Sequence, residues 1–316
     1  MKKVLAVAAI LGLAGAAQAQ VTMYGLIDMS IGQNQIGFKD QKVDFFSGGD
    51  NGSSQGNSTT RVGLKGSTLV APGITAKFNL ETAGITSNGD VGGGGTPFFN
   101  RQAWAGFAGS FGEVRLGKQD SVAFQTMVGF DFNGAANAAA AQQNALAGTW
   151  FGAGGRQDRS LQYITPDMGG LKAQVGFQPK GNVAGAEDNL SLGVSYAAGP
   201  LAVAIVGEGK RAKAGNDFYS VAGSYDLGVV KVMLGYADGG KDLRGTTFGI
   251  TAPVAGLNVG LNYTLNSDSK AGATEIFVNK EIFKGTYAYF DYGNLDKANA
   301  AFNKGDAYAL GVIYTF

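Results

Sequence analysis

Apolar and polar residues alternate along much of this chain with a period of two. In residues 256–266, GLNVGLNYTLN, the odd positions from Leu257 to Leu265 are apolar, and the even positions carry asparagine, glycine or threonine. The last ten residues, AYALGVIYTF, place a bulky apolar side chain at every second position from Tyr308 to Phe316. Since successive side chains of a strand point to opposite faces, each such stretch predicts a strand with one apolar face.

Sixteen stretches follow this pattern, separated by turn signals rich in glycine, proline and aspartate. Each approaches the ~9–11 residues that a tilted strand needs to cross a bilayer. The predicted strands are 21–31, 58–68, 73–84, 98–109, 112–119, 158–166, 170–178, 187–197, 200–208, 215–226, 228–238, 244–252, 256–266, 273–282, 285–293 and 305–316.

The predicted connections alternate between long and short. The short ones are turns of a few residues, and a membrane barrel with both ends of the chain on one side produces this alternation. The longer, polar connections are 32–57, 85–97, 120–157, 179–186, 209–214, 239–243, 267–272 and 294–304.

A soluble β-sandwich also alternates, so the polar face must decide between the two folds. That face is rich in glycine, asparagine, serine and threonine across a dozen or more strands, which suits the lumen of a large closed barrel. Arg61 and Lys65 alternate with Val62 and Leu64, and each would cost ~2–4 kcal/mol if it faced lipid at mid-depth. The sequence therefore predicts an all-β, transmembrane, 16-stranded antiparallel barrel with a water-filled interior.

The N-terminus has the plan of a secretory signal peptide. Lys2 and Lys3 precede an apolar run at residues 4–17, and Ala17-Gln18-Ala19 forms an A-x-A cleavage site. The alternative is an N-terminal membrane anchor, but the run is shorter than the ~18 apolar residues that such a helix needs. We expect a signal peptide at 1–19 and a mature barrel at 20–316, exported to the cell outer membrane.

Cysteine and histidine are absent from the 316 residues. Their absence excludes disulfides, thiolate metal sites, the Ser-His nucleophile pair and the commonest metal ligand. The stretch GEVRLGKQ at 112–119 has the spacing of a phosphate loop, but Gln119 replaces the required Ser or Thr and the stretch alternates like a strand. No enzyme activity, cofactor or metal is therefore expected.

Net charge gives no sign of a nucleic-acid partner. Without Lys2 and Lys3 the 25 basic residues become 23, against 24 acidic ones, so the mature chain has a charge near −1. Nucleic-acid-binding proteins usually show a basic excess. Any electrostatic function must come from local sorting of charge.

Several segments carry a family resemblance that spans essentially the whole mature chain. They are 23-MYGLID-28, 61-RVGLKGS-67, 77-KFNLE-81, 99-FNRQAWAGFAGSFGEVRLGKQ-119, 159-RSLQYITPDMGGLKAQVGF-177 and the terminal aromatic residue. The chain resembles Gram-negative general porins of the β-proteobacterial type. The resemblance implies a homotrimer of barrels in outer-membrane lipid, which passes small hydrophilic solutes and inorganic ions.

The resemblance also gives the C-terminal strand a role in assembly. In this family a final strand ending in Phe is recognised by the barrel-assembly machinery, which implies that Phe316 and Tyr314 form the assembly signal. Many relatives have a basic or histidine-containing final strand, whereas this chain ends in VIYTF. The terminal Phe and the alternation are both kept.

The longest connection, 120–157, is implied by the resemblance to fold into the barrel as a constriction. Loops of this length in compact proteins are usually functional or disordered, so an exposed flexible loop is the alternative. Residues 135–148, AANAAAAQQNALAG, predict a short helix inside it.

The resemblance implies a ring of charged side chains at this constriction. The matching basic positions are Arg61, Arg101 and Arg159, and the matching acidic ones are Asp28 and Glu81. Lys65, Lys77 and Arg115 lie on nearby strands, and the loop itself holds little charge beyond Asp120, Asp131, Arg156 and Asp158. Arginines held in a low-dielectric constriction predict a weak preference for anions. The alternative for each arginine is a structural ion pair, for example with Glu81.

A further expectation concerns the direction of the side chains that follow Arg101. If Arg101 points into the lumen, strict alternation turns Gln102 and Trp104 outward.

The predicted function is an outer-membrane diffusion channel. The alternatives are a substrate-specific channel on the same barrel, which an aromatic ladder in the lumen would favour, and an outer-membrane enzyme or adhesin.

Overall fold

The computed structural model of the protein describes residues 20–91, 97–152 and 154–316. They form one antiparallel sheet with a few short helices. The strands are β1 (Gln20–Asn34), β2 (Asp44–Ser47), β3 (Arg61–Ala71), β4 (Ile74–Ala83), β5 (Gln102–Gly109), β6 (Gly112–Asp120), β7 (Arg156–Ile164), β8 (Leu171–Gln178), β9 (Asn189–Ala198), β10 (Leu201–Glu208), β11 (Phe218–Asp226), β12 (Lys231–Asp238), β13 (Arg244–Val254), β14 (Leu257–Asn266), β15 (Gly272–Phe283), β16 (Thr286–Leu295) and β17 (Gly305–Thr315). The helices are α2 (Asp50–Ser53), α3 (Val122–Met127), α4 (Ala141–Ala145) and the 3₁₀ turns η1 (Val128–Phe130) and η2 (Thr149–Phe151).

The first and last strands close the sheet into a barrel. Asn34 to Leu26 of β1 pair with Ala307 to Thr315 of β17, and Gln20 to Leu26 of β1 pair with β3. The four-residue β2 stays outside the ring because it pairs only with β1. Of the 17 strands that the structure describes, β1 and β3 to β17 therefore form a closed ring of sixteen, as predicted.

The two faces of the wall separate by polarity. Phe248 and Tyr263 are cross-strand neighbours on β13 and β14, and both are exposed on the outside. One residue further along, Thr247 and Thr264 face inward, fully buried, with their hydroxyl oxygens 2.8 Å apart. The outer surface therefore suits hydrocarbon, and the inner one carries polar side chains.

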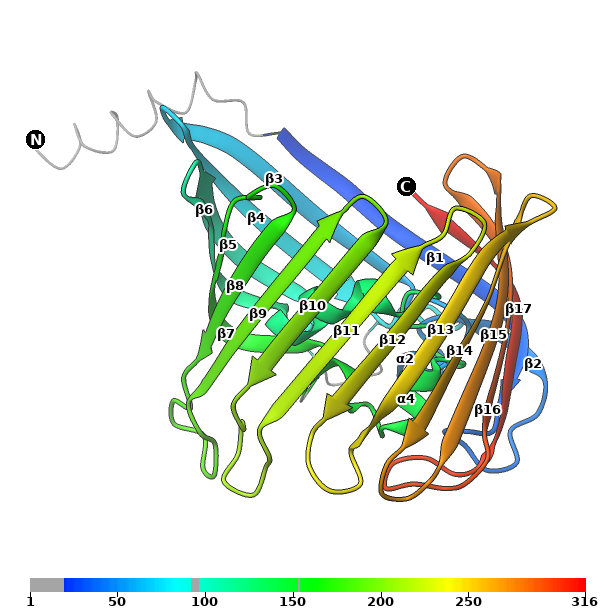
Figure 1. Ribbon diagram of the computed structural model, residues 1–316. Coiled ribbons are helices and arrows are strands. Elements are labelled where there is room, and N and C mark those ends of the chain that lie inside the picture. The colour runs from blue at the N-terminus through cyan, green and yellow to red at the C-terminus, as the bar shows by residue number, and fades with distance from the viewer. Residues whose placement is uncertain (1–19, 92–96, 153) are drawn as a thin grey trace, which may run out of the picture.

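The connections differ at the two ends of the barrel. Figure 1 shows tight turns at the end where the C-terminal strand finishes and longer loops at the opposite end. Gly73 and Gly285, in the turns β3–β4 and β15–β16, have φ values of +75° and +71°, a conformation that favours glycine. In outer-membrane barrels the short turns face the periplasm.

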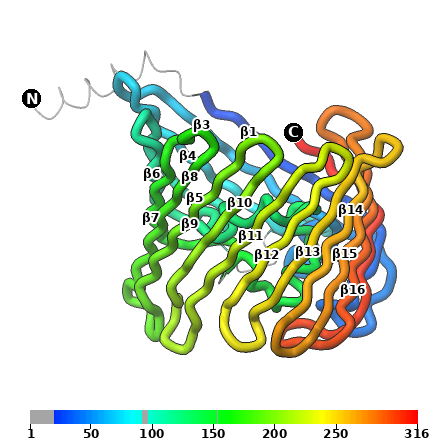
Figure 2. Tube along the Cα trace, in the orientation of Figure 1, coloured from blue at the N-terminus to red at the C-terminus, as the bar shows by residue number. Residues whose placement is uncertain are grey.

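The interior of the barrel is not empty. The tube in Figure 2 shows the green segment between β6 and β7 running through the middle of the barrel, behind the strands β9 to β12. Within the described residues, no helix is both long and apolar enough to cross a membrane. The signal peptide predicted at residues 1–19 lies outside the described residues.

All sixteen predicted strands are confirmed, with ends that differ by a few residues. Strand β2 was not predicted, because DFFS is too short to show a period of two. The predicted helix within 135–148 is confirmed as α4. Helix α3 was not predicted. Ser121 caps its N-terminus, because the Ser121 hydroxyl accepts a hydrogen bond from the backbone N–H of Phe124.

Ring closure gives a stability prediction. A Cβ at Gly32 of β1 would lie 2.1 Å from the carbonyl oxygen of Tyr308, so Gly32→Val must separate β1 from β17. We expect a loss of about 1–3 kcal/mol of stability, the usual cost of overpacking. The measurement is the urea concentration at which half of the protein has unfolded, followed on unheated gels by the loss of the band of the folded barrel. Gly37→Val is the control, because a Cβ there meets nothing within 4 Å; equal midpoints for the two variants would contradict the prediction.

Candidate functional site

The connection between β6 and β7, residues 121–155, lies inside the barrel and is attached to one half of its wall. Its side chains Val122, Met127, Leu146 and Trp150 are fully buried. Helix α3 contacts β8 to β11, and α4 contacts β14 to β16. The wall contributes small or apolar inward residues to the same cluster, namely Ala204, Val206, Ala222, Met233, Ala237 and Ala273. The expected in-folded loop is therefore confirmed, and it leaves the wall formed by β1 and β3 to β7 open to the lumen.

Buried amides and carboxylates fix the middle of this loop. The side-chain nitrogen of Asn133 donates to Glu275 Oε1 at 2.9 Å and to Asp291 Oδ1 at 3.0 Å. Glu275 Oε2 also accepts from Asn262 Nδ2 at 2.9 Å and from the backbone N–H of Ala141 at 3.3 Å. Buried polar groups are costly unless they are paired, so this network holds the loop against β14 to β16.

Asp28 and Asp131, two of the acidic residues predicted for the constriction, belong to this buried framework. Asp28 accepts the backbone N–H groups of Asn57 and Ser58 at 2.9 and 2.6 Å, and the hydroxyl of Tyr289 at 2.7 Å. Asp131 accepts the backbone N–H of Asn133 at 3.0 Å. Both are buried, and the structure does not bring them to the cavity described next.

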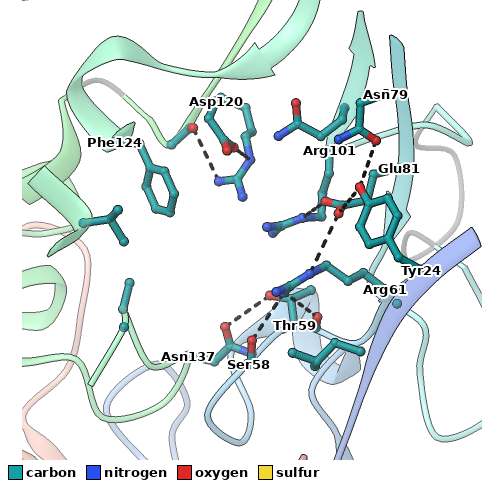
Figure 3. Close-up of a pocket in the computed structure, with 18 of the residues that line it drawn as sticks. Tyr24, Ser58, Thr59, Arg61, Asn79, Glu81, Arg101, Asp120, Phe124 and Asn137 are labelled. Atoms are coloured by element: carbon teal, nitrogen blue, oxygen red, sulfur yellow. Dashed lines mark hydrogen bonds and ion pairs between the residues drawn. The ribbon is translucent and has the colours of Figure 1, made fainter. Parts of the chain in front are cut away.

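A cavity of about 810 Å³ lies between the in-folded loop and the opposite wall. Figure 3 shows Arg61 and Arg101 reaching into it from the strands, across from Phe124 of the loop. Arg101 Nε lies 2.5 Å from Glu81 Oε1, and Arg61 Nε lies 3.9 Å from Glu81 Oε2. Arg156, at the start of β7, completes the group with its Nε 2.6 Å from Asp120 Oδ1. We call this space the arginine cavity.

Charge is distributed unequally around the arginine cavity. Of its described lining residues, Arg61, Lys65, Arg101 and Arg156 are basic, and only Glu81 and Asp120 are acidic. Within the loop, the lining residues of 121–155 are uncharged and include Phe124, Val128, Ala135, Asn137, Gln143 and Phe151. The positive charge of one wall is thus opposed by a neutral wall, and the cavity keeps a net positive potential.

Two contacts position these side chains. The hydroxyl oxygen of Tyr24 lies 2.8 Å from both Glu81 Oε2 and Asn79 Oδ1, and donating its one proton to Glu81 orients the carboxylate that binds Arg101. The guanidinium carbon of Arg156 lies 4.7 Å from the ring centre of Phe124, a cation–π contact. Arg101 and Arg156 are therefore both held in place beside the cavity.

The other predicted basic residues lie farther along the same wall, toward the short turns. Lys65 lines the arginine cavity and also a second cavity that contains Lys77 and Arg115. Lys77 and Arg115 share the carboxylate of Glu113, at 2.7 and 2.6 Å. Sequence reasoning gave no role to Glu113.

Arg159, which was predicted at the constriction, does not line the arginine cavity. A bulge where β7 faces Gly117 to Gln119 leaves Arg159 exposed with a φ of +52°, and it lines a separate cavity of about 210 Å³ with Lys118 and Lys180. Arg156 borders both cavities and lines the arginine cavity in the place predicted for Arg159. A signal was available, because Arg159 shares its alternation with the outward Leu161 and Tyr163.

The alternation expected from Arg101 to Trp104 breaks just before β5 begins. Gln102 and Trp104 were expected to face outward, but both are buried and line the two cavities. Arg101 precedes the first residue of β5, so the strand's alternation does not fix its direction. Its side chain can therefore share the lumen with Gln102.

Among the residues that the structure describes, no three His, Cys, Asp or Glu side chains are grouped so that they could hold a metal ion.

Loop attachment gives a pH prediction. Burial, together with the neighbouring Glu275, raises the pKa of Asp131 well above its usual 3.8. The attached loop then holds a proton that the detached loop would release, so attachment weakens as the pH rises from about 4 through the raised pKa. We expect hydrogen-exchange protection of residues 131–145, corrected for intrinsic rates, to fall with rising pH. Asp131→Asn should flatten this dependence; an unchanged slope in the variant would refute the assignment.

Comparison with known proteins gives a consistent result. The outer membrane porin protein 32 of Delftia acidovorans is 30% identical over 99% of this chain and 92% of its own length, and an outer membrane porin protein of Bordetella pertussis is 29% identical over 99% and 90%. The anion-selective porin from Comamonas acidovorans has the same fold, with a TM-score of 0.73 at 24% identity over 95% of this chain and 100% of its own. The Gram-negative porin family model matches residues 6–316. The chain therefore belongs to the Gram-negative porin family and is a diffusion channel of the outer membrane.

Proposed function

We propose that this porin prefers anions, and that Arg61, Arg101 and Arg156 at the constriction carry the preference. The supporting observation is the imbalance of the arginine cavity, where four basic residues and two carboxylates face an uncharged loop wall. A unit charge at ~4 Å contributes about 1 kcal/mol in water and about 4 kcal/mol at an effective dielectric of ~20. Even the smaller value changes the occupancy of the constriction by an anion several-fold.

The relatives support the same reading. The Comamonas acidovorans porin, which shares the fold, is described as anion-selective. We propose no catalytic activity for this chain; its role is the passage of small hydrophilic solutes and inorganic ions.

We propose that the channel is a homotrimer embedded in outer-membrane lipid. OmpT of Vibrio cholerae, which has the same fold with a TM-score of 0.66, is known in a trimer form. Outward apolar side chains such as Met23, Leu64 and Phe107 are exposed on the wall, where lipid or a neighbouring subunit would cover them. Chemical cross-linking of detergent-purified protein should give a ladder that stops at three chains.

Selectivity is tested by removing charge one arginine at a time. We expect Arg61→Gln, Arg101→Gln and Arg156→Gln each to lower the anion-to-cation permeability ratio about two-fold or more, because each removes one charge from the constriction. The measurement is the reversal potential of planar bilayers in a KCl gradient.

Arg159→Gln is the matched control, because Arg159 lies outside the arginine cavity. If it changes the ratio as strongly as Arg156→Gln does, then the assignment of Arg156 is wrong. If no variant changes the ratio, the arginine cavity does not set selectivity.

Assembly is tested at the C-terminus. We propose that Phe316 and Tyr314, whose ring centres are 5.9 Å apart, form the signal that the barrel-assembly machinery recognises. Phe316 also exchanges two backbone hydrogen bonds with Gly25, at 3.0 and 3.2 Å. Phe316→Ala keeps those backbone bonds, so refolding in detergent should remain near wild type while outer-membrane yield in cells falls several-fold. Equal loss in both settings would indicate a structural role alone.

A further inference from the structure

A second cavity of about 340 Å³ lies on the short-turn side of the arginine cavity. Arg61 and Lys65 are on the same face of β3, four residues apart, which is about 13 Å along the strand. Lys65 lines both spaces, and Lys77 and Arg115 line only the second. A solute that leaves the arginines toward the short turns therefore meets these three cations next.

Two of these cations are held by aromatic rings. Lys65 Nζ lies 4.9 Å from the ring centre of Tyr24, and the guanidinium carbon of Arg115 lies 4.5 Å from the ring centre of Trp104. A cation–π contact positions a cation without a neutralising carboxylate. Within the described residues, Lys65 has no carboxylate partner.

Only one carboxylate balances the group. Glu113 contacts Lys77 Nζ through Oε2 at 2.7 Å and Arg115 Nε through Oε1 at 2.6 Å. The two terminal nitrogens of Arg115 have no hydrogen-bond partner among the described residues. Three positive charges against one negative charge leave a net charge of +2 beside an open cavity.

Glycines shape this part of the wall. Gly106 is the cross-strand neighbour of both Lys77 and Arg115, so no side chain separates the two cations. Gly63 lies opposite Tyr24, where a Cβ would come within 2.6 Å of the Tyr24 ring. The missing side chains let the Tyr24 ring lie against the wall and bring both cations to one carboxylate.

We propose that Lys65, Lys77 and Arg115 form a second anion-binding site, which holds a compact divalent oxyanion on its way out of the constriction. The net charge of +2 matches a divalent anion, and the terminal nitrogens of Arg115 suit the paired oxygens of a sulfate or phosphate group. Thr22 and Ser67, which also line the cavity, can donate hydroxyl hydrogen bonds. The inference rests on the proposed anion preference and adds a site and a ligand class to it.

The test compares currents carried by sulfate and chloride. Purified channels in planar bilayers are bathed in increasing potassium sulfate, and the concentration of half-maximal conductance reports binding. The double variant Lys65→Gln, Arg115→Gln should raise that concentration about five-fold or more, because two of the three charges are lost. Chloride conductance should saturate at a higher concentration than sulfate conductance, and the double variant should change it less.

A variant of opposite sign keeps the test independent of folding defects. Glu113→Gln removes the only carboxylate of the cluster, so sulfate should bind more tightly and the half-maximal concentration should fall two-fold or more. Lys172→Gln is the matched control for loss of a cation at the same end of the barrel, because Lys172 lies next to the β7–β8 turn, 3.5 Å from Asp167. It should leave sulfate saturation unchanged.

The outcomes separate this site from the constriction. If the wild-type reversal potential shows no anion preference, the proposed selectivity is wrong and so is this inference. If anion preference is present but the double variant and Glu113→Gln both saturate with sulfate as the wild type does, the second site alone is refuted. An equal effect of Lys172→Gln would also refute it, because net charge at that end would then explain the result.

Discussion

Every feature of this channel depends on the closure of a hydrogen-bonded ring. A strand edge in hydrocarbon leaves backbone N–H and C=O groups without partners, and each costs several kcal/mol. The pairing of β1 with both β17 and β3 removes that edge. Closure also separates two environments, because it fixes which face of each strand meets lipid and which meets the lumen.

Closure makes a lumen, but it does not make a constriction. The segment 121–155 supplies one by attaching to the β8 to β16 half of the wall with an apolar cluster and a buried amide–carboxylate network. Four acidic side chains, Asp28, Asp131, Glu275 and Asp291, are used in this framework and are buried. None of these four carboxylates lines the arginine cavity, so a nearly neutral chain keeps more basic than acidic side chains there.

The cations of the open wall are held in two different ways. Arg101 is fixed by Glu81, and Lys77 and Arg115 by Glu113, so part of their charge is neutralised locally. Lys65, Arg115 and Arg156 also lie against the rings of Tyr24, Trp104 and Phe124, which orient a cation without neutralising it. Arg115 and Arg156 have a carboxylate partner as well, whereas Lys65 has none among the described residues. In these three contacts the aromatic rings of the lumen therefore position charge.

The sequence alone determined the sixteen strands, their inward and outward faces and the in-folded loop, because a period of two, turn residues and family motifs are local properties. It also predicted Arg61, Arg101 and Glu81 for one site, and the structure brings these three to the arginine cavity. It could not assign Asp28 and Asp131 to the buried framework, because their distant partners, Tyr289 for Asp28 and Asn262 for Asp131, meet them only when the barrel closes and the loop folds in. Arg156 lines the arginine cavity in place of Arg159 because of a bulge in β7. Trp104 points inward because β5 begins at Gln102, after Arg101. Such one-residue irregularities reverse the face of a side chain, and only the tertiary structure decides where they occur.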